Sequence, residues 1–109
     1  MTSRASENEI ERALAGLEGW KREGEALVKT FRCASFREAV AFVGRAAELA
    51  EAAQHHPDIL IRYRRVTLTL STHDAGGITE KDLALARRIE AQAAAGPRSA
   101  PVTGSGRCG

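Results

Sequence analysis

Hydrophobic and polar positions repeat along the chain with two different periods, and these periods predict its helices and strands. Apolar residues recur at helical spacing in three segments: 7–15, 35–53 and 79–95. Alternation with a period of two, rich in β-branched residues, predicts strands at 27–33, 58–63 and 65–71, and a short strand at 20–25 precedes the first of them. The predicted order is therefore α-β-β-α-β-β-α.

Capping residues fix where these helices begin and end. Ser6 and Ser35 are each followed three residues later by Glu, which is the spacing of a capping box. Pro57 stops the second helix, because its ring disfavours helical geometry at the preceding residue. The apolar face of that helix is expected to comprise Phe36, Ala39, Val40, Val43, Ala47 and Ala50.

Two hairpins and three helices with one apolar stripe each predict an α+β fold. The expected architecture is a two-layer sandwich, a four-stranded antiparallel sheet with three helices on one face. A chain of 109 residues normally closes one core, and we expect that domain to span residues 1–95. Residues 96–109 are rich in Gly and hold one large apolar residue, so they are expected to be a disordered tail.

Composition narrows the classes of function. Sixteen basic residues against 14 acidic ones give a net charge of +2, which argues against direct nucleic-acid binding through bulk charge. The longest apolar run is far shorter than the roughly 20 residues that span a bilayer, so no membrane association is expected. Residues 1–9 contain no apolar stretch of the kind found in signal peptides, and a cytoplasmic location is expected.

All three histidines fall beside one predicted hairpin. His55 and His56 end the second helix, and His73 follows the strand that returns from residue 65 to 71. If the strands at 58–63 and 65–71 pair, the three imidazoles meet at one rim. Imidazole exchanges protons near neutral pH, so this cluster favours acid–base chemistry.

Other interpretations of these residues remain open at this point. Histidines are common at surfaces, so the three residues can be without a function. A zinc site is a further interpretation. A structural zinc site needs four ligands, usually including Cys, and the side chains of neighbours such as His55 and His56 diverge, which argues against zinc. Asp82, three residues after Thr79, fits a helix cap, and Asp74 fits a turn before a Gly pair.

Two segments together resemble the pterin-4a-carbinolamine dehydratase family, also called 4a-hydroxytetrahydrobiopterin dehydratases. The resemblance extends from about Gly19 to Ile89. Its most specific parts are Ala47-Glu48-x-Ala50-Glu51-x-x-x-His55-His56-Pro57-Asp58 and Ser71-Thr72-His73-Asp74-Ala75-Gly76-Gly77-Ile78-Thr79-x-x-Asp82.

The resemblance implies an enzyme that removes water from 4a-hydroxytetrahydropterin and gives quinonoid dihydropterin for recycling. It implies a homodimer or homotetramer that uses no metal and no organic cofactor. A non-catalytic interaction or assembly protein with the same fold is the alternative. The family's catalytic residues match His55, His56, His73 and Asp82, and its substrate contacts match Gln54, His55, His56, Ser71, Thr72, His73 and Asp74.

Proton delivery to the leaving hydroxyl and proton removal from N5 need two positioned groups. We expect His55 and His73 to transfer these protons and His56 to orient or stabilise the substrate. Asp82 is expected to orient a histidine while it caps its helix.

Overall fold

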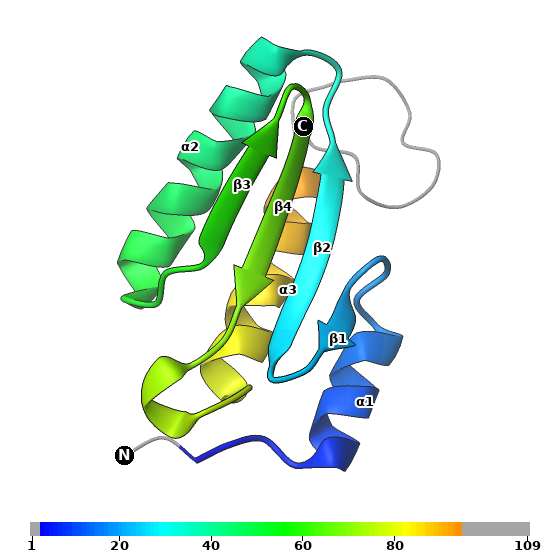
Figure 1. Ribbon diagram of the computed structural model, residues 1–109, viewed down its shortest axis with the longest axis vertical. Coiled ribbons are helices and arrows are strands. Elements are labelled where there is room, and N and C mark those ends of the chain that lie inside the picture. The colour runs from blue at the N-terminus through cyan, green and yellow to red at the C-terminus, as the bar shows by residue number, and fades with distance from the viewer. Residues whose placement is uncertain (1–2, 95–109) are drawn as a thin grey trace.

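A computed structural model describes residues 3–94 and contains every helix and strand that the periodicity predicts (Figure 1). The 3₁₀ helix η1 within the loop after the last strand is the one addition. The elements in chain order are α1 (Glu7–Ala15), β1 (Lys21–Glu23), β2 (Ala26–Arg32), α2 (Phe36–Ala53), β3 (Asp58–Arg62), β4 (Arg65–Leu70), η1 (His73–Ala75) and α3 (Glu80–Ala94). The α+β prediction and the order α-β-β-α-β-β-α are confirmed.

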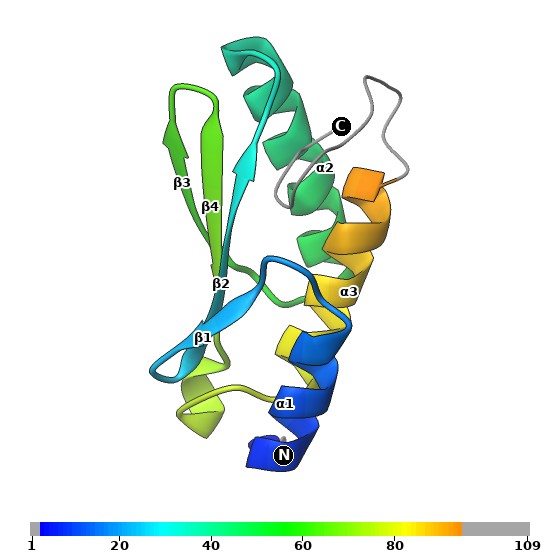
Figure 2. The same ribbon diagram turned by 90° about the vertical axis from the view of Figure 1, so that its right-hand side faces the viewer.

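The four strands form one antiparallel sheet in the order β1-β2-β4-β3. Within residues 3–94, the three α-helices lie on one face of the sheet and no α-helix lies on the opposite face (Figure 2). Alternation along the central strands turns Leu27 and Phe31 of β2, and Val66, Leu68 and Leu70 of β4, into the core, where they are fully buried. Strand β3 is left at an edge.

Local caps set the helix ends as predicted. The Ser6 hydroxyl accepts from the Glu9 N–H at 3.1 Å, and the Glu9 carboxylate accepts from the Ser6 N–H at 2.7 Å, which completes a capping box. The Ser35 hydroxyl accepts from the Glu38 N–H at 3.1 Å. Helix α2 ends at Gln54, whose φ of 54° is left-handed and turns the chain immediately before the histidine pair.

The core-facing side of α2 differs from the predicted stripe. The buried side chains are Ala39, Phe42, Ala46 and Ala50. Phe36 and Val40 are about half exposed, at 53% and 47%. Helix α2 runs along the edge strand β3 (Figure 1), so only the side of the helix that faces α3 and the sheet meets the core, and the rest of its apolar surface faces outward.

The sequence also predicted a disordered tail, a domain boundary and the absence of membrane association. The disordered tail at 96–109 and the domain boundary at residue 95 lie outside the described residues. Among the helices of residues 3–94, none is long and apolar enough to cross a membrane.

Candidate active site

A pocket of about 210 Å³ opens where β3 begins and β4 ends. Its lining residues are His56, Asp58, Thr69, Ser71 and His73. Asp58 pairs with Thr69 across the two strands, and Thr69 and Ser71 alternate with the core residues Leu68 and Leu70. The alternation places this part of the pocket wall on the helix-free face of the sheet.

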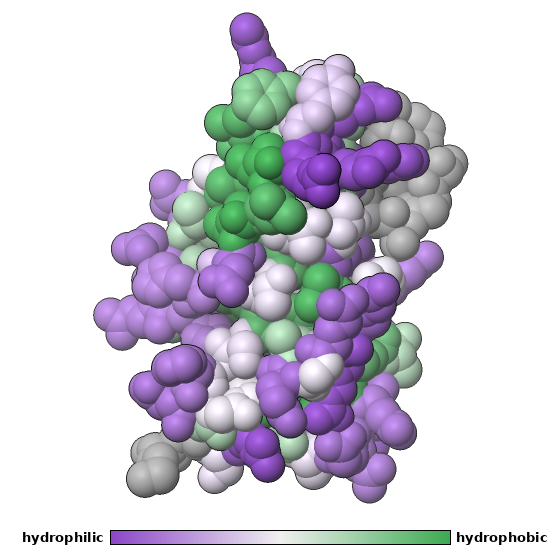
Figure 3. Space-filling model, viewed as in Figure 1, coloured by the Kyte–Doolittle hydropathy of each residue, from purple (hydrophilic) through white to green (hydrophobic). Residues whose placement is uncertain are grey.

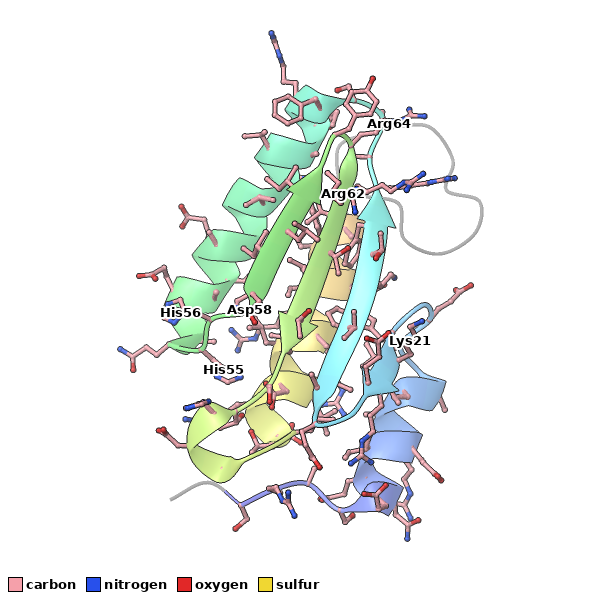
Figure 4. The ribbon with its side chains drawn as sticks, in the orientation of Figure 1. Lys21, His55, His56, Asp58, Arg62 and Arg64 are labelled. Atoms are coloured by element: carbon pink, nitrogen blue, oxygen red, sulfur yellow. The ribbon has the colours of Figure 1, made fainter. Side chains whose placement is uncertain are left out.

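His55 and His56 diverge, as adjacent side chains at a helix end are expected to do. The His55 Nε2 atom lies 2.5 Å from Asp82 Oδ1, and the His55 side chain is 11% exposed. The His56 Nε2 atom lies 2.7 Å from Glu51 Oε2, and both of those side chains are exposed. Figure 4 shows His55, His56 and Asp58 together at one end of the sheet.

Asp82 connects the loop after β4 to the start of α3. It is fully buried. Its Oδ2 atom accepts from the Thr79 N–H and from the Thr72 hydroxyl, each at 2.8 Å. The Thr72 and Thr79 hydroxyl oxygens are themselves 2.7 Å apart. Asp82 therefore caps its helix and contacts a histidine at once, as the sequence suggested.

The contact with Asp82 gives His55 a defined chemistry. A carboxylate only accepts hydrogen bonds, so the Nε2–H of His55 donates to Asp82. In the neutral ring, Nδ1 is then the atom that can take a proton. An imidazole held in one tautomer by a buried carboxylate is suited to repeated proton transfer.

The residues predicted to contact substrate do not all line the pocket. Ser71 and His73 line the pocket, and the Ser71 hydroxyl donates to the Glu25 carbonyl at 2.8 Å. Thr72 is buried against Asp82. Gln54 and Asp74 are exposed and lie outside the pocket lining.

Sequence reasoning missed three residues of this site. Glu51 contacts His56, and Asp58 and Thr69 form part of the pocket wall. Glu51 and Asp58 both stood in the quoted motif that contains His55 and His56, so the sequence held a signal for each of them. Thr69 had no such signal, because its place in the pocket wall depends on the register of β3 and β4.

Two further features bear on the choice of site. A larger hollow of about 640 Å³ lies at the opposite end of the sheet and is lined by Arg32, Arg62, Tyr63, Arg64 and Arg65. It contains no group that exchanges protons near neutral pH, so the histidine pocket is the candidate active site. Within residues 3–94, no group of three or more His, Cys, Asp or Glu side chains is placed to hold a metal ion.

Comparison with known proteins decides the family. Residues 3–92 match the family model described as pterin 4 alpha carbinolamine dehydratase. The chain belongs to the pterin-4a-carbinolamine dehydratase family. A Thermomicrobium roseum relative that carries the name of such a dehydratase is 58% identical over 87 residues, which are 80% of this chain and 94% of the relative. A Chloroflexus aurantiacus relative with the same name is 59% identical over 87 residues, with the same coverage of both chains.

Solved structures support the same family. A transcriptional coactivator/pterin dehydratase from Brucella melitensis has a TM-score of 0.78 and 38% identity, covering 82% of this chain and 97% of its own. A pterin dehydratase-like protein identified as a RuBisCO assembly factor in the α-carboxysome has a TM-score of 0.57 and 30% identity, covering 67% of this chain and 87% of its own. The resemblance drawn from the sequence is confirmed.

Proposed function

We propose that the chain is a pterin-4a-carbinolamine dehydratase, a carbon–oxygen lyase that converts 4a-hydroxytetrahydropterin into quinonoid dihydropterin for reuse. The observation that carries this proposal is the placement of His55, fixed by buried Asp82, at the same end of the sheet as the pocket lined by His56 and His73. Membership of the dehydratase family supports it independently.

The reaction needs one proton delivered and one removed. The C4a–O bond breaks as the hydroxyl receives a proton and leaves as water, and N5 loses its proton as the C4a–N5 double bond forms. We assign the two proton transfers to His55 and His73. The two histidines differ in surroundings, because His55 contacts Asp82 whereas His73 lies on the pocket wall. A positioned acid or base typically accelerates such a step by about 10²–10⁴-fold.

The remaining pocket residues bind and orient the substrate. His56, held by Glu51, presents its ring at the pocket wall and orients or stabilises the pterin. Ser71, Thr69 and Asp58 supply hydroxyl and carboxylate groups suited to the amino and ring N–H groups of a pterin. In this proposal Gln54, Thr72 and Asp74 act around the pocket, and Thr72 does so by holding Asp82.

The assembly-factor alternative has less support. The structural similarity to the RuBisCO assembly factor is the weaker of the two, with a TM-score of 0.57 against 0.78. A protein that only binds partners has no need of a histidine held by a buried carboxylate beside a pocket.

The pterin is the proposed small-molecule partner, and a homodimer or homotetramer is the proposed assembly. The exposed edge strand β3 and the outward-facing apolar residues Phe36 and Val40 support self-association. The cytoplasmic location stays a prediction from the sequence, which cell fractionation checks.

The test of the proposed activity is an assay of the full chain with freshly generated 4a-hydroxytetrahydropterin, followed by absorbance of the quinonoid product. We expect dehydration far faster than the spontaneous reaction. A rate equal to the spontaneous one, from folded protein at micromolar concentration, contradicts the proposal.

A further inference from the structure

The hairpin end of the sheet carries a basic hollow that the proposed function does not use. Its volume is about 640 Å³, and its lining residues are Arg32, Arg62, Tyr63, Arg64 and Arg65. Figure 3 looks onto the helix-free face and shows strongly hydrophilic side chains at this end of the sheet, where Figure 4 labels Arg62 and Arg64. Sites for small molecules commonly have volumes of about 300–1,000 Å³, so the hollow has room for a ligand of that kind.

Three of these arginines form one row across the sheet. Arg65 of β4 pairs with Arg32 of β2 on one side and with Arg62 of β3 on the other. Residues that face each other across antiparallel strands share one face of the sheet, with Cβ atoms roughly 4.5–5.5 Å apart. The next residue along β4, Val66, is buried in the core, so the row lies on the helix-free face. One ligand on that face can contact all three guanidinium groups.

The row destabilises the chain unless an anion balances it, because like charges directly opposite each other in a sheet repel. Within residues 3–94, none of the four arginines of the hollow has an ion-pair partner. Residues 95–109 contain no Asp or Glu. Charged side chains protect an edge strand from pairing, which explains Arg62 but not Arg65, because β4 is an inner strand. An anionic ligand accounts for the whole row.

Hydrogen bonds hold the hairpin tip in place beside the row. The Arg64 carbonyl oxygen accepts from the Cys33 N–H at 2.8 Å, and the Arg64 guanidinium donates to the Ala34 carbonyl at 3.3 Å. The tip is therefore joined to the segment that follows β2. A site whose backbone is fixed beforehand loses less conformational entropy when a ligand binds.

Tyr63 adds an aromatic surface to the hollow. The residue is 72% exposed, and its φ of 57° is left-handed, which is uncommon for a bulky residue. The guanidinium carbon of Arg64 lies 5.9 Å from the centre of the Tyr63 ring. An exposed ring beside cations suits a ligand that has both a planar ring to stack and an anionic part to bind the arginines.

The extent of the basic surface indicates a small ligand rather than a polymer. On the same face of β3, Arg62 is followed toward the other end of the sheet by Leu60 and then by the acidic residue Asp58. Nucleic acids bind through cations that neutralise many successive phosphates. Here the row covers three strands, or roughly 10 Å at an inter-strand spacing of about 4.8 Å. A chain of two or three phosphates can follow this row, whereas a single phosphate reaches only part of it.

We propose that the hollow binds a nucleoside di- or triphosphate, with its phosphates on the row of arginines and its base on Tyr63. Guanidinium groups bind phosphate oxygens in pairs through charge-assisted hydrogen bonds, which favours Arg over Lys in such a site. The hollow lies at the opposite end of the sheet from the histidine pocket, and binding there does not require the dehydratase activity.

Calorimetric titration of the full chain with ATP, without magnesium, tests the site. We expect saturable binding that weakens as sodium chloride is raised, because salt screens exposed charges. Arg65→Gln removes the central guanidinium and should raise the Kd by about tenfold or more, the loss of hydrogen bonds to a charged group. Arg88→Gln is the matched control, since it changes the net charge equally at an exposed position of α3 outside the hollow, and it should leave the Kd unchanged.

A second variant tests the place of the base. Tyr63→Asn removes the ring and keeps a residue that adopts left-handed backbone readily. It should raise the Kd for ATP about fivefold or more, the loss of one stacking contact, and should leave the Kd for inorganic tripolyphosphate unchanged. Unchanged ATP binding by Tyr63→Asn overturns a ligand with a stacked base.

Thermal unfolding gives a readout that needs no ligand. Without ATP, Arg65→Gln should melt at a higher temperature than the wild-type chain, because it removes two like-charged neighbours. A lower melting temperature would show that the row does not destabilise the chain, and contradicts the proposal. Absence of ATP binding by the folded wild-type chain, or binding that Arg65→Gln does not weaken, overturns it. Tighter binding of a single-stranded oligonucleotide through the same arginines would identify a polymer as the ligand and would overturn it as well.

Discussion

At the scale of single residues, Asp82 joins the site to the fold. Its carboxylate receives the Thr79 N–H, the Thr72 hydroxyl and the His55 ring N–H. Thr72 and Thr79 are buried together with Asp82, so their donors have little access to water as a substitute partner. The same contacts therefore hold the helix start and the histidine.

Replacement of Asp82 is expected to affect stability and turnover together. Asp82→Ala leaves buried donors without an acceptor and should lower the free energy of unfolding by about 3 kcal/mol. Asp82→Asn keeps a carbonyl for Thr79 and Thr72 but presents an amide N–H₂ to His55, which favours the other tautomer. We expect it to lose less stability and to lower kcat strongly. Urea unfolding and dehydration kinetics on both variants check this, and an Asp82→Asn enzyme with wild-type kcat contradicts the orienting role.

His73 is expected to behave in the opposite way. Its side chain is exposed on the pocket wall, so His73→Ala should cost under about 1 kcal/mol of stability. If it transfers a proton, turnover should fall by about 10²-fold or more. Arg88→Ala, at an exposed position of α3 outside the pocket lining, is the control and should keep most activity. Wild-type turnover in His73→Ala would show that another group carries this proton.

At the scale of elements, a buried charge ties β2 to α3. The Lys29 side chain carries a charge although it lies on the core face of β2, where it is only 4% exposed. Its ammonium forms an ion pair with Glu90 of α3, donates to the Glu18 carbonyl at 2.8 Å and lies 4.6 Å from the centre of the Phe31 ring. The Trp20 indole N–H donates to the same Glu90 carboxylate at 2.9 Å.

Breaking this tie should destabilise the docking of α3. Lys29→Met leaves the Glu90 carboxylate, about a quarter exposed at 27%, without its cation and should cost about 2 kcal/mol. The double variant Lys29→Met with Glu90→Gln removes both charges and keeps an acceptor for Trp20, so it should be more stable than Lys29→Met alone. Thermal melts of the two variants measure the difference. Equal melting temperatures would indicate that the unpaired carboxylate is simply solvated.

At the scale of the whole molecule, the use of a metal or organic cofactor can be tested. The family resemblance implies chemistry without a metal, and in the proposal the described histidines carry the proton transfers themselves. We expect full activity after dialysis against EDTA, with no stoichiometric metal by elemental analysis. Activity that EDTA abolishes and one divalent metal restores would overturn this expectation.

The local sequence was enough to predict every α-helix and strand of residues 3–94, because each depends on neighbouring residues. It did not predict the 3₁₀ helix η1. Periodicity identifies strand and helix, and caps such as Ser6 and Ser35 act within one turn. Two motifs beside one hairpin also predicted that the histidines gather at one end of the sheet. That part of the site followed from chain order alone, since a hairpin returns the chain to its starting end.

Only the tertiary structure decided which of these residues touch. The sequence did not show that Phe36 and Val40 face outward, because that depends on α2 running along the edge strand. Nor could it pair Asp58 with Thr69 or bury Thr72 against Asp82, because strand register and loop packing join residues distant in the chain. A local pattern fixes which element forms and which of its sides is apolar. What each side meets is set by the packing of all elements together, and so the contacts of the site were decided there.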